Sequence, residues 1–341
     1  MHRFRWTDLQ ADADRREGVP LMKKPNDKQE CGLRALMGAA LILNAMSFVS
    51  SGSAQTQVQI DQCENKGNAY SPDRAVEGCT AAIESGRWSG KLLAAAFVNR
   101  GNAYAYKRDY DRAIADYTQA IQLDPKYATA FYKRGNAYHD KGAYDRAIAD
   151  YSQAIQLDPK YAAAFVNRGS EYYDKGNYDR AIADYTQAIQ LDPKFAAAFD
   201  NRGNAYHQKG NNDRAIADYT QAIQLDPKNA AAFNNRGSAY LQKDDNDRAI
   251  ADYTQAIQLD PKYAMALRSR GLIQLKLGAF DRAIADYSAA IAENAKDPYS
   301  LYGRGVAKLK NGDTAGGNAD MAAAKQIKPD IADVYASYGI K

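Results

Sequence analysis

Apolar residues recur in this chain with the spacing of α-helices. In residues 94–127, Phe97, Gly101 and Tyr104 are four and three positions apart, which places them on one face of a helix. A second stripe of the same period follows, formed by Ala113, Ile114, Tyr117, Ala120 and Ile121. A short polar turn separates the two stripes. The pattern therefore predicts an antiparallel pair of helices.

The helical pair recurs at a fixed interval of 34 residues. The string DRAIADYTQAIQLDPK fills residues 111–126, 179–194, 213–228 and 247–262. It recurs at 145–160 with Ser152 in place of Thr, and a decayed copy fills 281–296. Self-similarity at a fixed period predicts stacked repeats rather than a compact globule. Nearly identical repeats cannot each hold a unique active site, but together they build a long surface.

Small and turn-forming residues mark the ends and contacts of the predicted helices. Most repeats place glycine between the two helices, where it permits the left-handed conformation that ends a helix. Pro125 stops the second helix, and Asp124 before it is predicted to cap the next helix. Gly101 and Ala113 are expected where the two helices approach most closely, so larger side chains there would separate them.

Several positions are shared by the repeats, and in the first repeat they are Phe97, Gly101, Tyr104, Ala113, Tyr117, Ala120 and Pro125. In this pattern the chain resembles the tetratricopeptide repeat (TPR) family. That family often carries leucine before the glycine. This chain carries arginine there, at Arg100, Arg134, Arg168, Arg202, Arg236, Arg270 and Arg304, which resembles a bacterial, exported arginine–glycine variant. The resemblance implies an all-α, right-handed superhelical solenoid of stacked antiparallel helix pairs.

The resemblance covers residues 60–341 and weakens at both ends. We expect a shortened N-terminal repeat at 55–93, seven 34-residue TPR units at 94–331, and a partial C-terminal capping helix at 332–341. Atypical end repeats are expected because each faces solvent on one side.

Residues 1–54 predict a secretory signal peptide. A basic stretch from Met22 to Arg34 precedes the apolar residues 35–49, and small residues follow up to Ala54. We expect cleavage after Ala54, a true start at Met22 rather than Met1, a periplasmic or secreted location, and no membrane span in the mature form. The alternative is an uncleaved anchor, although the apolar run is shorter than the roughly 18 residues that a span needs.

Removal of the signal leaves two cysteines, Cys63 and Cys79. An even pair in an oxidising compartment predicts a disulfide. The bridge would contribute on the order of 3 kcal/mol in the chain-entropy account. It would also staple one end of the stack, where a repeat array frays most. The alternative is a pair of buried thiols.

The mature chain lacks a constellation typical of catalysis. His139 and His207 are two repeats apart and are predicted to be ordinary surface residues. Asp116 is predicted to pair with Arg112, four residues earlier, on a solvated face. Acidic and basic residues alternate and the formal net charge is only +4, which argues against a nucleic-acid footprint. We expect no metal, no cofactor and no enzymatic activity.

The family resemblance implies that the first helices line a concave groove. Two columns of the first helices vary between repeats. One reads Val98, Tyr132, Val166, Asp200, Asn234, Arg268, and the other reads Ala105, His139, Tyr173, His207, Leu241, Leu275. Asparagines accompany them at Asn99, Asn167, Asn201, Asn235 and at Asn102, Asn136, Asn204. A side-chain amide both donates and accepts hydrogen bonds, so a row of them suits an extended peptide backbone. The alternative is drift at unconstrained exposed positions.

These features predict a non-enzymatic scaffold that binds protein or peptide segments in the groove. The predicted contact residues are Asn99, Asn102, Tyr132, Lys133, Asn136, His139, Asn167, Tyr173, Asn201, Asn204, His207 and Asn235. Lys133 and Arg268 are isolated, so a cationic clamp for a carboxylate is not expected. The alternative function is a structural one, in which copies associate end to end through the C-terminal edge and organise the envelope.

Overall fold

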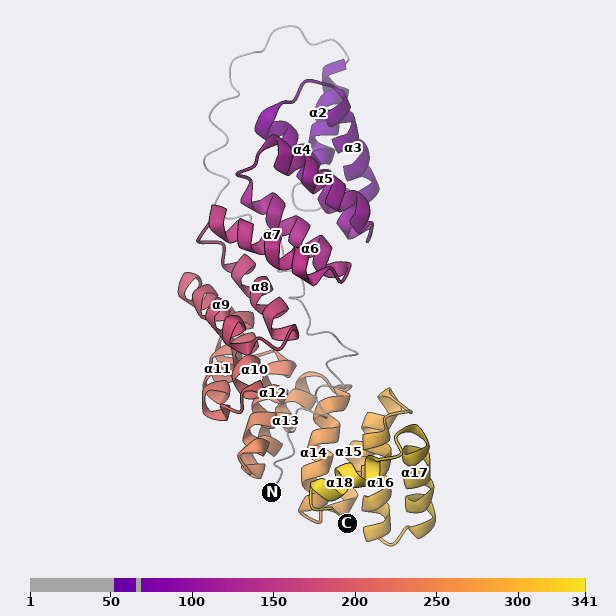
Figure 1. The fold of residues 1–341 in the computed structure, drawn as a ribbon. Coiled ribbons are helices and arrows are strands. Elements are labelled where there is room, and N and C mark those ends of the chain that lie inside the picture. Colours follow the sequence, from indigo (N-terminus) through magenta and orange to yellow (C-terminus); the bar gives the residue numbers. More distant parts are fainter. Residues whose placement is uncertain (1–51, 66–68, 341) are drawn as a thin grey trace. The chain divides into compact units, whose positions relative to one another are not determined.

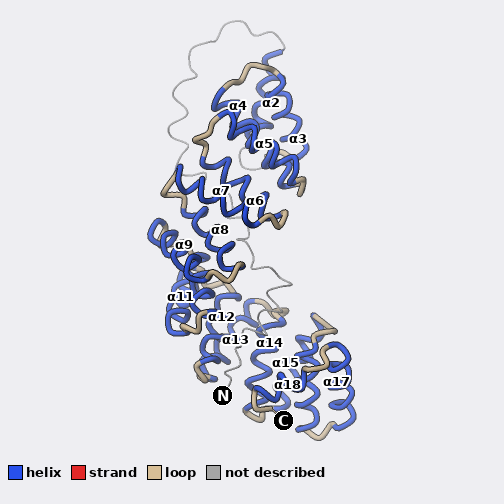
Figure 2. The backbone as a smooth tube through the Cα atoms, in the orientation of Figure 1, coloured by secondary structure: helices blue, strands red, loops and turns tan. Residues whose placement is uncertain are grey.

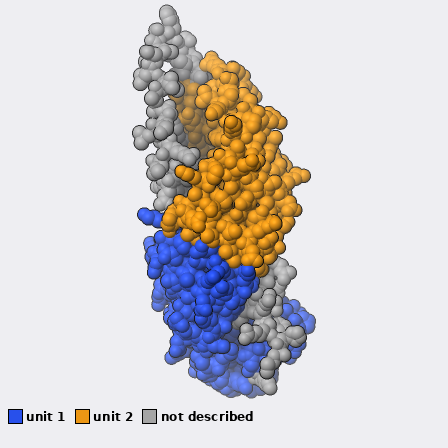
Figure 3. All heavy atoms as spheres, turned by 60° about the vertical axis from the view of Figure 1, so that its left-hand side comes forward, with its two compact units in different colours: residues 1–17, 194–341 blue, residues 18–193 orange. Residues whose placement is uncertain are grey.

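The computed structural model describes residues 52–65 and 69–340. These residues form 17 α-helices and no strand (Figures 1 and 2), so the all-α prediction is confirmed. The chain comprises two compact units, coloured in Figure 3. Of the described residues, unit 2 contains 52–65 and 69–193, and unit 1 contains 194–340. The predicted signal segment up to residue 51, with the proposed start at Met22, lies outside the described residues.

Unit 2 consists, where it is described, of consecutive helix pairs. Its helices are α2 (Gly52–Glu64), α3 (Pro72–Glu84), α4 (Gly90–Tyr106), α5 (Tyr110–Leu123), α6 (Ala128–Asp140), α7 (Tyr144–Leu157), α8 (Ala162–Asp174) and α9 (Tyr178–Leu191). Each even-numbered helix packs against the odd-numbered helix that follows it. The first helices of neighbouring pairs also touch, α2 with α4 and α4 with α6.

Unit 1 repeats this arrangement. Its helices are α10 (Ala196–Gln208), α11 (Asn212–Leu225), α12 (Ala230–Gln242), α13 (Asn246–Leu259), α14 (Ala264–Lys276), α15 (Phe280–Glu293), α16 (Pro298–Lys310), α17 (Thr314–Ile327) and α18 (Ile331–Ser337). First helices again touch in sequence, from α10 through α12 and α14 to α16. Within each unit the first helices therefore form one continuous face.

The helix pairs from α4–α5 to α14–α15 close around a tyrosine from the second helix. Tyr117 is 1% exposed and lies against Gly101, where an added Cβ would stand 2.7 Å from the tyrosine Cε1 atom. The same contact recurs as Gly135–Tyr151, Gly169–Tyr185, Gly203–Tyr219 and Gly237–Tyr253. The predicted close approach at Gly101 is confirmed, because only a residue without a side chain leaves room for the ring.

The turns inside the pairs adopt the left-handed conformation. Gly142 has a φ of 74°, and four other repeats also use glycine there. Arg108 (φ 61°) and Asp244 (φ 58°) take the same conformation without being glycine. These two positions carry backbone strain that their sister repeats avoid.

The predicted cap at the repeat junction is wrong. Asp124 follows α5 as its C-cap, and its Oδ1 accepts a hydrogen bond from the Lys126 amide at 3.1 Å. Helix α6 begins only at Ala128, and Tyr127 before it makes no side-chain cap. Three residues therefore separate the aspartate from the helix it was expected to cap, and the carboxylate closes the junction turn instead.

The arginine before each helix-crossing glycine forms a partly buried ion pair. Arg236 on α12 donates from Nε and Nη2 to the two carboxylate oxygens of Asp252 on α13, both at 2.8 Å. Its Nη1 donates to Thr220 Oγ1 of the preceding pair at 3.1 Å. Arg100, Arg134, Arg168, Arg202, Arg270 and Arg304 make the same two-oxygen pair.

We call this series of Arg–Asp pairs the ladder, and it shows that the predicted pair of Asp116 with Arg112 is wrong. Asp116 is 5% exposed and accepts from Arg100 across the helix pair. Arg112 instead pairs with the N-cap residue Asp109. Asp116 faces the partner helix rather than solvent, so the charge at this position stabilises the crossing of the two helices.

The two ends of the array are closed differently. At the N-terminal end Cys63 of α2 and Cys79 of α3 form a disulfide, as predicted, and both residues are buried. Helix α2 begins at Gly52, so the predicted cleavage point after Ala54 lies in its first turn. At the C-terminal end α18 packs on α16 and α17 and buries Ile331 and Tyr335. End-to-end association through this edge stays a prediction.

Within residues 52–65 and 69–340, none of the helices is both long enough and apolar enough to cross a membrane.

Candidate protein-binding face

The predicted contact residues all lie on first helices. In unit 2, α4 carries Asn99 and Asn102, α6 carries Tyr132, Lys133, Asn136 and His139, and α8 carries Asn167 and Tyr173. In unit 1, α10 carries Asn201, Asn204 and His207, and α12 carries Asn235. We call the surface formed by these helices within a unit its first-helix face.

Three of the seven predicted asparagines are fixed by the buried tyrosines. Asn102 Oδ1 accepts from the Tyr117 hydroxyl at 2.9 Å, Asn136 from Tyr151 at 2.8 Å, and Asn204 from Tyr219 at 2.7 Å. Ser170 and Ser238 replace asparagine in two repeats and bond Tyr185 and Tyr253. The asparagine oxygen thus satisfies a buried hydroxyl, a role that sequence reasoning missed.

The amide nitrogens of these asparagines remain on the half-buried surface. Among the described residues, the Nδ2 groups of Asn102 and Asn204 have no hydrogen-bond partner. A hollow of about 300 Å³ beside α4 is lined by Asn99, Asn102 and Tyr106 together with Cys63 and Tyr70. This part of unit 2 offers fixed amide donors next to an open space.

Asn167 is not part of an exposed row of asparagines. It is 6% exposed, and its Nδ2 donates to Asn136 Oδ1 at 2.9 Å and to the Tyr132 hydroxyl at 3.2 Å. Tyr132 itself packs against the rings of Tyr151 and Tyr161, with centroids 5.9 and 4.8 Å away. These side chains contact one another between α6 and α8, so they are not available to a ligand.

The two variable columns are mostly interior as well. Val98, Val166, Asn234, Leu241 and Leu275 are all at most 6% exposed. Drift at unconstrained exposed positions is therefore the wrong explanation for this variation. The columns pack between neighbouring first helices, so each junction has its own set of contacts.

The α6–α8 junction of unit 2 contains a cluster of ionisable groups. His139 Nδ1 lies 2.5 Å from Glu171 Oε1, and Glu171 is completely buried. Burial lowers the pKa of His139, but the hydrogen bond to Glu171 and its charge outweigh this, so the pKa is raised. Solvent reaches Asp174, yet partial desolvation and the Glu171 charge raise the pKa of its carboxyl to about 6.

The histidine of the equivalent junction in unit 1 is surrounded by amides. His207 is 7% exposed, with Nδ1 2.9 Å from Asn212 Oδ1 and Nε2 3.3 Å from Gln242 Nε2. Burial lowers its pKa, and the hydrogen bond with Asn212 offsets only part of this. The prediction that both histidines are ordinary surface residues is wrong, since each sits in a junction between first helices.

Asp200 adds a partly buried carboxyl to the unit 1 face. Burial raises its pKa to about 6, against a hydrogen bond from Asn235 Nδ2 at 3.4 Å. The described part of the chain contains no group of three His, Cys, Asp or Glu side chains that could hold a metal ion.

Comparison with known families decides the identity of these helix pairs. The TPR repeat profile matches residues 101–142, 135–170, 169–210 and 203–244. The tetratricopeptide repeat profile matches residues 234–300 and 269–330. The chain belongs to the tetratricopeptide repeat family. Proteins of this family serve as interaction scaffolds and are generally non-enzymatic.

Solved TPR structures share the fold. A tetratricopeptide repeat protein from Parabacteroides merdae matches at 22% identity, with a TM-score of 0.54 over 75% of this chain and 99% of its own. PilF from Pseudomonas aeruginosa matches at 18% identity, with a TM-score of 0.56 over 61% of this chain and 96% of its own.

YrrB, described as a TPR protein with an unusual peptide-binding site, matches at 27% identity and a TM-score of 0.49, covering 57% of this chain and 99% of its own. None of the curated proteins matches.

Glu171 is the TPR residue that sequence reasoning missed most clearly. At the equivalent position of other repeats the chain has Ala103, Ala137, Ala205, Ala239 and Ala307, all buried. The signal was present as one charged exception in an alanine column. It was overlooked because helical periodicity does not distinguish a charged residue at a core position from a surface one.

Proposed function

We propose that the first-helix face, and that of unit 2 above all, binds extended segments of partner proteins. The observation that carries this proposal is the row of asparagines whose side-chain oxygens are fixed by buried tyrosines. Because each oxygen is already bonded, each amide is oriented with its NH₂ group as the remaining donor. A backbone carbonyl of an extended segment accepts such a bond regardless of its side chain.

Fixing the donors in advance lowers the entropy lost on binding. An immobilised side chain otherwise costs about 0.5–1.5 kcal/mol when an interface forms. Asn102 and Asn136 are held by hydroxyls from the second helices of their own pairs. The second helices therefore support the face without contacting the ligand, which fits their near identity between repeats.

Site-specific photo-crosslinking tests this assignment. A benzophenone amino acid replaces Lys133 on the first-helix face of α6, or exposed Gln119 on the second helix α5 as the matched control. Both positions lie in unit 2. Crosslinks to partner proteins from position 133 and not from 119 are expected. Equal labelling from both positions, or labelling from 119 alone, contradicts the proposal.

We also propose export of the protein through the segment before Ala54. The disulfide supports this, because disulfides persist mainly in oxidising compartments. N-terminal sequencing of the protein from its natural host is expected to begin near Gln55. A mature N-terminus at Met1 or Met22 contradicts cleavage.

A further inference from the structure

Glu171 is a costly exception in an array of near-identical repeats. Its carboxylate is completely buried, at a position where alanine fills the space in five other repeats. Burying a charge is unfavourable unless partners compensate it. The alanine that those five repeats bury here carries no charge. At this one position the chain buries a carboxylate, which is energetically unfavourable.

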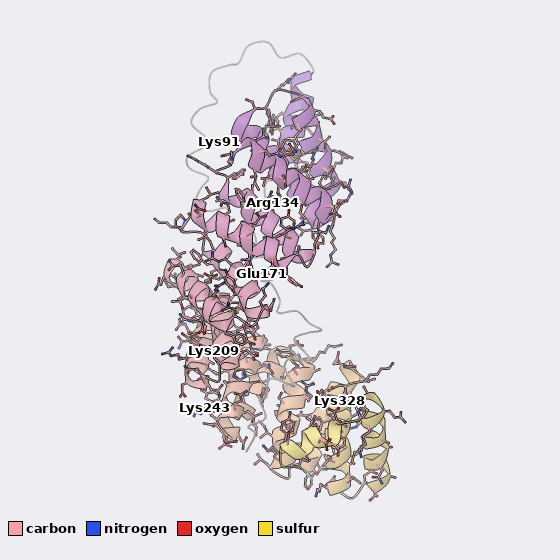
Figure 4. The ribbon with its side chains drawn as sticks, viewed as in Figure 1. Lys91, Arg134, Glu171, Lys209, Lys243 and Lys328 are labelled. Atoms are coloured by element: carbon pink, nitrogen blue, oxygen red, sulfur yellow. A yellow bond between two sulfur atoms is a disulfide. The ribbon has the colours of Figure 1, made fainter. Side chains whose placement is uncertain are left out.

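The compensation for this buried charge is incomplete. Glu171 Oε1 has His139, whereas Oε2 is buried with no hydrogen-bond partner among the described residues. His139 is the outer member of the pair, since its side chain is 20% exposed and that of Glu171 is not exposed at all. Figure 4 labels Glu171 on α8, within unit 2.

Two further carboxylates lie at the rim of the same junction. Asp140 ends α6 and Asp174 ends α8, and both are exposed. The charges of Glu171, Asp140 and Asp174 all act on His139. One imidazole thus feels the charges of three carboxylates and directly contacts that of Glu171.

The nearest lysines do not neutralise this cluster. Lys141 pairs with Asp111 and Lys175 with Asp145, each in a salt bridge to the second helix of the preceding pair. Both lysines follow the rim aspartates directly in sequence, yet they are engaged elsewhere. Even when His139 is protonated, the three carboxylates outnumber it, so the junction keeps an excess of negative charge on the first-helix face.

We propose that Glu171, Asp174 and Asp140 form a subsite for a lysine side chain of the segment bound along unit 2. This inference rests on the function proposed above and names the chemistry of one partner residue. An ammonium group is compact and carries three donors in three directions. It suits carboxylates that approach from two different helices. Asp140 and Asp174 make the first contacts, and the charge of Glu171 attracts the ammonium group from behind them.

The equivalent junction in unit 1 lacks every element of the subsite. Ala239 stands where Glu171 does, while Gln208 and Gln242 stand where Asp140 and Asp174 do. The chain itself thus supplies the matched substitutions Glu171→Ala, Asp140→Gln and Asp174→Gln. Each introduces a residue that the same fold already accommodates at that place.

The test measures fluorescence anisotropy of a labelled peptide of alternating glycine and lysine, titrated with the full chain at low salt. Asp140→Gln/Asp174→Gln and Glu171→Ala are each expected to weaken binding by about tenfold. The same peptide with acetylated lysines is expected to bind the wild-type chain as weakly. The control Glu77→Gln/Glu84→Gln makes the same charge change on exposed positions of α3 and is expected to bind as the wild type does.

Three results overturn the proposal: no binding to the wild-type chain, equal binding by the acetylated peptide, or an equal loss in the α3 control. None of them decides the proposed function, because the crosslinking at positions 133 and 119 uses no lysine peptide. Conversely, crosslinks that fail to distinguish the two faces, together with a lysine-dependent loss in the variants, leave a cation site without a segment-binding face.

Discussion

The α6–α8 junction and the α10–α12 junction are built from the same repeat and treat the same residue in opposite ways. His139 and His207 occupy one position in sister repeats. His139 faces a carboxylate and has a raised pKa, while His207 is buried between amides and has a lowered pKa. The exchanges between the junctions include Tyr144 for Asn212, Glu171 for Ala239, Asp140 for Gln208 and Asp174 for Gln242. A stacked array thus acquires local chemistry through a few junction residues while its frame stays constant.

The Arg–Asp ladder is common to both units, so breaking one of its pairs should reduce the free energy of unfolding equally in either unit. This is the largest effect that we expect. Arg134→Leu in unit 2 and Arg236→Leu in unit 1 each leave a buried aspartate without its partner. We expect each to reduce the free energy of unfolding by about 3–5 kcal/mol. Urea denaturation followed by circular dichroism measures this loss. A loss in only one unit would show that the ladder is not common to both.

Relieving the backbone strain in two turns should change the free energy of unfolding by less, and in the opposite direction. Arg108→Gly and Asp244→Gly place glycine at the left-handed positions where sister repeats already have it. We expect each to stabilise the chain by about 1 kcal/mol, because glycine removes the steric strain at positive φ. Thermal unfolding measures the shift. Gly142→Arg is the reverse control, and destabilisation by a similar amount is expected there.

The smallest effect that we expect is the dependence of the free energy of unfolding on pH through the two histidines. Their contributions oppose each other when the chain is measured as a whole. The stabilisation by His139, whose pKa is raised, is complete below the unfolded value of about 6.5 and is lost as pH rises through the folded value. The stabilisation by His207, whose pKa is lowered, is present above about 6.5 and is lost as pH falls. Acidification therefore increases the stabilisation by His139 in unit 2 and decreases that by His207 in unit 1.

Hydrogen exchange resolved by unit measures these opposing trends. Leucine fills the equivalent position at Leu241 and Leu275, so His139→Leu and His207→Leu are the matched variants. Each is expected to remove the histidine contribution from its own unit only. Asp174 and Asp200 titrate near the same pH, with pKa values raised to about 6. Asp200 is unchanged in both variants and cancels in the comparison with the wild type. The charge of His139 lowers the pKa of Asp174, so the His139→Leu profile contains the response of both groups. Identical pH profiles for the two variants would contradict the assignment.

The sequence predicted the frame far better than the junctions. Helical periodicity and the 34-residue interval located the helix pairs, and Gly101 marked their crossing. The partner of Asp116 was misassigned because Arg112 has a favourable spacing on the same helix, whereas Arg100 comes close only once the two helices pack. Glu171 and the tyrosine–asparagine bonds escaped for the same reason, since contacts between helices leave no periodic signal.

The central claim is that the residue 32 positions after the histidine sets the chemistry of a junction. NMR titration of the two histidine rings tests it in the wild type, in Glu171→Ala and in Ala239→Glu. The account predicts that the pKa of His139 falls when Glu171 is removed, and that the pKa of His207 rises above its usual value when a glutamate is introduced at Ala239. Unchanged pKa values in both variants would contradict it.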